Sequence, residues 1–94
     1  MDASTLVITG EFGIYRAAEL KPQLLAHVMD LEDPALDLRD VTETDAAGLQ
    51  LLLFARREAA ARGKRLRLAG ASPAVQEVLR VAGIEPDHWN EMPA

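Results

Sequence analysis

The side chains with the clearest capacity for chemistry are four carboxylates in one short stretch of the chain. Asp37, Asp40, Glu43 and Asp45 lie close together in the sequence, and clustered carboxylates are the ligands that hard divalent cations prefer. Their spacing does not match an EF-hand loop, and no glycine stands at the turn position that such a loop requires. We therefore expect a solvated loop without a metal, in which Asp45 caps the helix that follows.

Other groups that could carry out catalysis are sparse. The chain has no cysteine, and His27 and His88 have no histidine or carboxylate partner at a metal-binding spacing. Neither Ser4 nor Ser72 lies in a nucleophile-elbow sequence. The two glycines within residues 10–13 do not form a dinucleotide-binding fingerprint. The sequence therefore predicts a protein that is not an enzyme and that uses no cofactor and no metal.

Length, charge and hydropathy narrow the class of protein further. A chain of 94 residues can build one domain around one core. A net charge of −5 argues against a general nucleic-acid binder, which would need a basic surface. The first residues lack the features of a signal peptide, and no apolar run is long enough to insert into a membrane. We expect one cytoplasmic domain over residues 1–94, and the lack of cysteine fits a reducing compartment.

The elements that must position the carboxylates alternate between strands and helices. β-Branched residues predict a strand at 5–9, and a brief second strand at 11–14 would join it in a tight antiparallel hairpin. An apolar face at three- and four-residue spacing predicts a helix over residues 17–31. Pro22 conflicts with that helix, so the helix either begins near Lys21 or bends there.

The second half of the chain carries clear start and stop signals. A strand at 35–38 leads through a polar loop into a long helix at 46–62, which Gly63 ends. A strand at 66–69 follows, and then a helix that begins at Ser72-Pro73 and stops at Gly83. The predicted core covers about residues 5–84, with a polar tail at 85–94.

The resulting β-β-α-β-α-β-α order predicts an α/β fold. Two successive β-α-β units imply parallel strands with right-handed crossovers. We expect a small mixed sheet with the helices packed mainly on one face.

The long helix has more apolar residues than one buried face needs. At 100° per residue, Leu51 and Phe54 fall on the side away from the residues that can face the sheet. A third helix or the tail covers them, or they form an exposed apolar patch of the kind found at interaction sites.

Several segments in order resemble the STAS domain family, which includes bacterial anti-sigma factor antagonists and the C-terminal domains of sulfate transporters. They comprise Leu36–Val41, Asp45–Leu49, Gly63–Leu68 and the short helix that ends at Gly83-Ile84. The resemblance covers about residues 5–84 and implies a STAS-like fold and a non-catalytic bacterial regulatory protein. Residues 15–21 and 48–52 also look similar to stand-alone STAS proteins associated with chemotaxis kinases.

The resemblance gives the loop before the long helix a specific meaning. In STAS switches this loop commonly reads Asp-Ser-Ser-Gly or Asp-Thr-Ala-Gly, and Asp45 and Gly48 match its ends. The hydroxyl that is phosphorylated would fall at Ala47 or, in the Thr form, at Ala46. Both positions are alanine, so the resemblance implies that neither is phosphorylated.

We expect a partner protein to bind this loop and the first turns of the long helix. Thr42 and Thr44 are nearby hydroxyls, but both are displaced from the switch register, which leaves Thr44 as a poor candidate for modification. The predicted partner-binding residues are Thr42, Thr44, Asp45, Ala46, Ala47, Gly48, Gln50, Leu51 and Phe54.

Three functions remain open at this point. The partner could be an anti-sigma kinase or a chemotaxis signalling protein, with a role in transcription or signal transduction. The chain could instead be the small STAS subunit of a lipid-transporting ABC system, bound to a transporter ATPase, although the Thr of that subunit is missing here. A third alternative is a nucleotide or small ligand bound at the helix N-terminus.

Overall fold

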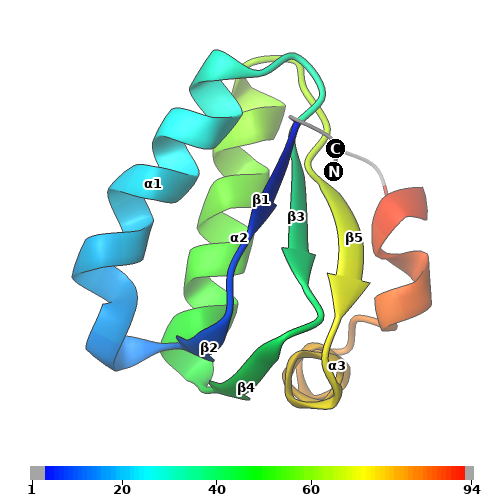
Figure 1. Cartoon of the computed structure of the whole chain (residues 1–94). Coiled ribbons are helices and arrows are strands. Elements are labelled where there is room, and N and C mark those ends of the chain that lie inside the picture. Colours follow the sequence, from blue (N-terminus) through cyan, green and yellow to red (C-terminus); the bar gives the residue numbers. More distant parts are fainter. Residues whose placement is uncertain (1–3, 93–94) are drawn as a thin grey trace.

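Parallel strands and flanking helices make up residues 4–92, the part of the chain that the computed structural model describes (Figure 1). The elements are β1 (Thr5–Val7), β2 (Gly10–Phe12), the 3-10 helix η1 (Ile14–Arg16), α1 (Ala17–Asp30), β3 (Ala35–Leu38), β4 (Val41–Thr44), α2 (Ala46–Ala61), β5 (Arg67–Ala71), α3 (Pro73–Val81) and the 3-10 helix η2 (Pro86–Glu91).

The strands form two small parallel sheets that continue into one another. One sheet has the order β1-β3-β5, and the other pairs β2 with β4. The backbone N–H of Ile8 donates to the oxygen of Asp37, and that of Gly10 donates to the oxygen of Asp40, at 3.1 Å each. The β2–β4 pair therefore extends the β1–β3 pair beyond a bend in both chains.

The antiparallel hairpin predicted for the first two strands is wrong. β2 runs on from β1 and pairs in parallel with β4, while Gly10 adopts a positive φ of 78° at the bend. The polar loop predicted after β3 is also wrong in part, because residues 41–44 form β4. The Val and Thr residues of β4 are β-branched and suit a strand, and Val41 is buried.

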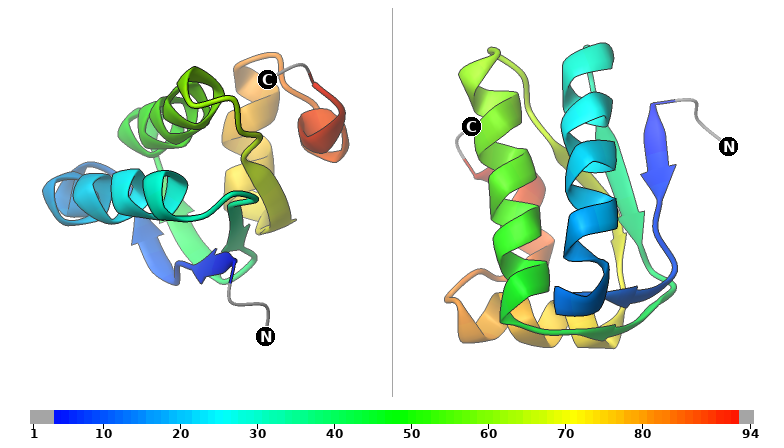
Figure 2. Two further views of the ribbon diagram at one scale, coloured as in Figure 1. Left: turned by 90° about the horizontal axis from the view of Figure 1, so that it is seen from above. Right: turned by 90° about the vertical axis from the view of Figure 1, so that its left-hand side faces the viewer.

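The helices confirm the predicted α/β class. α1 and α2 lie side by side over one face of the β1-β3-β5 sheet (Figure 2), and α3 lies at the carboxyl end of the strands (Figure 1). The core between helices and sheet is built largely from leucine and other apolar side chains of all these elements. No helix within residues 4–92 is long and apolar enough to cross a membrane.

The predicted helix boundaries hold where a cap residue specifies them. The Ser72 hydroxyl accepts the N–H of Val75 at 3.2 Å with Pro73 in the first turn, and Gly63 and Gly83 adopt the positive φ that ends a helix. α1 is different, because it begins at Ala17 and contains Pro22.

The start near Lys21 that Pro22 suggested is therefore wrong. Proline has no N–H to donate to the carbonyl of Ala18, four residues earlier. Ala18 and Pro22 are both exposed, so water can solvate that carbonyl and the helix continues past the proline.

Part of the segment 85–92 packs into the core, although most of its residues are polar and exposed, as expected. Trp89 is only 2% exposed, and its indole N–H donates to the oxygen of Leu66 at 3.0 Å. The Asn90 amide bonds both the N–H and the oxygen of Leu68, at 2.8 and 3.1 Å, and so closes the outer edge of β5. The predicted core therefore extends to η2, while residues 93 and 94 lie outside the described part.

Candidate functional site

Asp45 connects two elements at the start of α2. Its carboxylate accepts the N–H of Gly48 at 3.0 Å and the N–H of Ile14 at 3.2 Å, which confirms the predicted cap. These backbone donors, Gly48 first and Ile14 next, hold the pKa of the Asp45 carboxyl below its ordinary value. The ionised side chain thus fixes η1 against the N-terminus of α2.

The acidic stretch does not assemble a cation site. Among residues 4–92, no three His, Asp or Glu side chains come together in a way that could hold a metal ion. Asp45 bonds backbone N–H groups, and Asp37 pairs with the guanidinium of Arg39 at 2.9 Å. The carboxylates therefore act separately.

Gly48 is the point at which α2 packs directly against β2. It is buried, and a Cβ at this position would overlap the backbone oxygen of Phe12 and the hydroxyl of Thr44. The Thr44 hydroxyl itself donates to the Phe12 oxygen at 2.7 Å. Gly48 and the Thr44 hydroxyl are thus required for packing and hydrogen bonding inside the chain.

The patch predicted from Leu51 and Phe54 is mostly covered. Leu51 is only 6% exposed and belongs to the core, because α1 packs against α2. Phe54 is half-buried, and the ammonium of Lys21 on α1 lies 4.9 Å from its ring centroid. The alternative in which another helix covers this side therefore applies to Leu51, and the exposed patch is wrong for that residue.

The structure gathers the nine predicted partner-binding residues around one end of the molecule, but with unequal access. β2, β4 and the N-terminus of α2 meet at this end (Figure 1). Thr42, Asp45, Ala46 and Gln50 are exposed, Thr44, Ala47 and Phe54 are half-buried, and Gly48 and Leu51 are buried.

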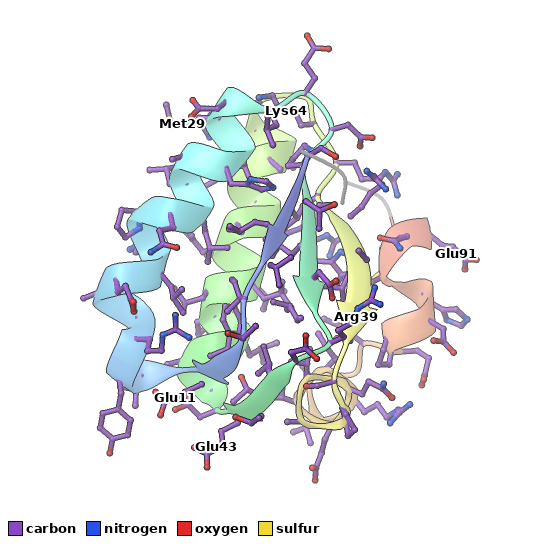
Figure 3. All side chains as sticks on the ribbon, in the orientation of Figure 1. Glu11, Met29, Arg39, Glu43, Lys64 and Glu91 are labelled. Atoms are coloured by element: carbon purple, nitrogen blue, oxygen red, sulfur yellow. The ribbon has the colours of Figure 1, made fainter. Side chains whose placement is uncertain are left out.

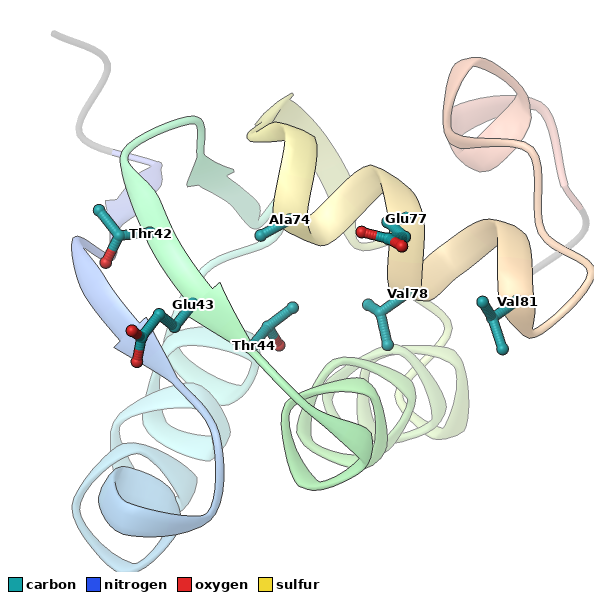
Figure 4. Close-up of a pocket in the computed structure, with 7 residues that line it drawn as sticks. All are labelled: Thr42, Glu43, Thr44, Ala74, Glu77, Val78 and Val81. Carbon is teal, nitrogen blue, oxygen red and sulfur yellow. The ribbon is translucent and has the colours of Figure 1, made fainter.

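Two grooves of opposite charge border the start of α2. The basic groove, about 370 Å³, lies between α1 and α2 and is lined by Ala17, Lys21, Ala47, Gln50, Leu51, Phe54 and Arg57. The acidic groove, about 560 Å³, lies between β4 and α3 (Figure 4) and is lined by Thr42, Glu43, Thr44, Ala74, Glu77, Val78 and Val81.

The sequence did not identify three exposed apolar side chains at this end. Ile14 and Tyr15 in η1 are 60% and 88% exposed, and Val81 in α3 is 83% exposed. The backbone N–H of Ile14 donates a hydrogen bond to the carboxylate of Asp45. Val81 lines the acidic groove together with Thr44. The sequence did carry a signal for Val81, because this apolar residue lies off the buried stripe of its helix and is therefore expected to be exposed.

Comparisons with known proteins agree with this fold. A sequence model of the family described as "Mlab, STAS domain" matches residues 1–86. The structure is similar to the anti-sigma factor antagonist SpoIIAA in its unphosphorylated form, with a TM-score of 0.72 and 20% identity, over 87% of this chain and 73% of that chain.

Two further structures are similar. A protein of Thermotoga maritima described as an anti-sigma factor antagonist has a TM-score of 0.73 and 16% identity, over 90% of this chain and 80% of that one. A structure named Mglu has a TM-score of 0.60 and 22% identity, over 69% of this chain and 16% of that one. No curated protein sequence matches the chain significantly. At these identities the structural likeness establishes a shared fold.

Proposed function

Because this chain belongs to the STAS domain family, we propose that it is a non-catalytic regulatory protein of the bacterial cytoplasm that binds a partner protein. The proposed surface consists of η1, the loop at Asp45 and the exposed side of the first turns of α2. The similarity to anti-sigma factor antagonists supports a role in signal transduction.

The observation that carries this proposal is the placement of exposed apolar side chains. Within residues 4–92, four large hydrophobic side chains are exposed, and Ile14, Tyr15 and Val81 are three of them. Ile14 and Tyr15 belong to η1 of the proposed surface, and Val81 belongs to the neighbouring helix α3. Met29, the fourth, lies at the opposite end of the molecule from Glu43 of β4 (Figure 3). Exposed apolar groups collected at one end, with polar groups around them, are typical of protein interaction sites.

We also propose that binding at this surface does not depend on phosphorylation of the loop. Ala46 is exposed and Ala47 half-exposed in the first turn of α2, and neither side chain can accept a phosphate. Thr44 remains a poor candidate because its hydroxyl is half-buried and bonded to Phe12. Regulation would then act on the partner.

A small anion bound at the N-terminus of α2 is a weaker alternative. Helix N-termini bind phosphate through free backbone N–H groups. Here the carboxylate of Asp45 already lies at this terminus and accepts the N–H of Gly48. A nucleotide phosphate would have to compete with a covalently attached anion.

The experiment is affinity capture from a native lysate with matched bait variants. Ala46→Arg places a long cation in the proposed surface, while Ala61→Arg makes the same change at an exposed position at the other end of α2, about 22 Å away at 1.5 Å per residue. We expect a partner captured by the wild type and Ala61→Arg to be lost with Ala46→Arg. Equal capture by both variants would show that the surface is elsewhere.

The identity of the captured protein decides between the two remaining roles. A protein kinase or chemotaxis protein would support signalling, and a transporter ATPase would support a lipid-transport subunit. Gly48→Arg is unsuitable as a probe because its Cβ alone would overlap the backbone of Phe12.

A further inference from the structure

The acidic groove exposes apolar side chains of α3, although another face of this helix is already buried in the core. α3 buries Val75 and Leu79 in the core, yet Val78 and Val81 also line the groove. In Figure 4, Thr44 points from β4 toward α3, and Val78 and Val81 lie along the same side of α3. Thus α3 presents a second apolar strip that no side chain of residues 4–92 fully covers, since Val81 is 83% exposed.

The charges beside this strip are negative and have no counter-ion in the described chain. Both glutamates line the groove: Glu77 lies on α3, and Glu43 lies on the side of β4 that faces away from α3 (Figure 4). Both are exposed. The ion pairs of residues 4–92 each involve an arginine with another carboxylate, and none includes Glu43 or Glu77. A cationic group of another molecule could therefore approach either one without displacing an internal partner.

We propose that the acidic groove binds an apolar segment of the partner protein that is flanked by lysine or arginine. Apolar side chains of this segment would cover Val78 and Val81, and its cations would face Glu77 and Glu43. The proposal rests on the proposed function, because it gives the chemistry of the partner and extends the interface from α2 onto α3. The basic groove, which contains Lys21 and Arg57, would repel the same segment, so the two grooves together fix the partner's orientation.

The first test uses two synthetic peptides and amide NMR spectra of the full chain. Both peptides have a Leu-Val-Leu centre, with two lysines on each side in one and two glutamates on each side in the other. We expect the lysine peptide to shift the amides of Thr44, Val78 and Val81, and the glutamate peptide to leave them unchanged. Higher salt should weaken the shifts, because it screens exposed charges.

Charge reversal supplies the matched control. Glu77→Lys removes an attraction and adds a repulsion, so the lysine peptide should bind about fivefold more weakly. Glu32→Lys changes the net charge equally at an exposed position outside both grooves and should leave the affinity unchanged. Equal binding of both peptides, unchanged binding to Glu77→Lys, or the absence of shifts would overturn the proposal. Shifts that depend on protein concentration alone would also overturn it, since they would indicate a second copy in the groove.

The captured partner separates failure of this proposal from failure of the proposed function. If Ala46→Arg abolishes partner binding but Glu77→Lys and Val81→Ser do not, the surface at α2 stands and the groove proposal is wrong. If Ala46→Arg has no effect, the surface assigned to the proposed function is wrong whatever the peptides show.

Discussion

Replacing Gly48 with alanine tests the close packing at the start of α2. Gly48 is the third residue of the helix, and at an ordinary exposed helical position this change stabilises a protein by about 1 kcal/mol. At Gly48 the new methyl group would overlap the Phe12 oxygen, which is a backbone atom, and the Thr44 hydroxyl. The structure therefore predicts the opposite sign.

The expected magnitude follows from three opposing contributions. Forcing an extra methyl group into a packed site costs about 1–3 kcal/mol, and displacing the Thr44 hydroxyl from the Phe12 oxygen costs about 1 kcal/mol more. The gain in helix propensity offsets about 1 kcal/mol of this. The net result is a loss of about 2 kcal/mol in the free energy of unfolding. For a domain of this size it lowers the Tm by about 10 °C.

Thermal and urea unfolding followed by circular dichroism measures this loss. Gly83→Ala is the control, because Gly83 has a positive φ of 81° but nothing within 4 Å of an added Cβ. It should cost only the backbone strain, about 1 kcal/mol. If Gly48→Ala unfolds at the wild-type Tm or above it, α2 does not pack on the backbone of Phe12 and the site geometry is wrong.

Three further changes test separate parts of the structure. Thr44→Val should lower the free energy of unfolding by about 1 kcal/mol while Thr44→Ser stays near wild type in urea titrations, and equal stability of the two would contradict the bond to Phe12. Trp89→Ala should cost about 3–5 kcal/mol by calorimetry, because this ring is in the core; a loss below 1 kcal/mol would place it on the surface. Burial raises the pKa of the Asp37 carboxyl, but hydrogen bonds and charge from Arg39 outweigh that effect and leave it below the ordinary 3.8. The stability that Asp37 contributes is thus present above about pH 4 and is lost as the pH falls through the lowered pKa. Asp37→Asn should therefore be less stable than wild type at pH 7 in urea titrations, and the difference should shrink as the pH falls through the lowered pKa. A difference that stays constant with pH would contradict the ion pair.

Features specified by local sequence were predictable. Asp45 and the Ser72-Pro73 pair marked helix starts, and Gly63 and Gly83 marked helix ends, since each acts on backbone groups within a few residues of itself. The strand at 35–38 and the long helix followed from their apolar patterns.

Features that depend on residues far away in the sequence could not be predicted. β4 carries two exposed polar residues, Thr42 and Glu43, and is a strand because β2 pairs with it. Gly10 suggested a tight turn, but the same positive φ also fits a bend between two parallel strands. Trp89 is a single aromatic in a polar segment, and its burial depends on Leu66, 23 residues away.

The candidate site shows the same division. The sequence predicted the loop and the start of α2. Of the two residues that match the family's loop, Asp45 caps the helix and Gly48 is required for close packing. A helical wheel shows which residues share a face but not how many neighbours the helix has, so it could not reveal that α1 covers Leu51. The contribution of α3 depends on where that helix crosses the end of the sheet, which no local pattern specifies.

The affinity of the captured partner for two matched variants tests the proposed surface most directly. Titration calorimetry with the purified partner should give a Kd about tenfold or more weaker for Ala46→Arg. The Kd for Ala61→Arg should stay within about twofold of wild type, because a single charge about 22 Å away is largely screened. Equal Kd values for both variants and the wild type would show that the start of α2 is not the binding surface.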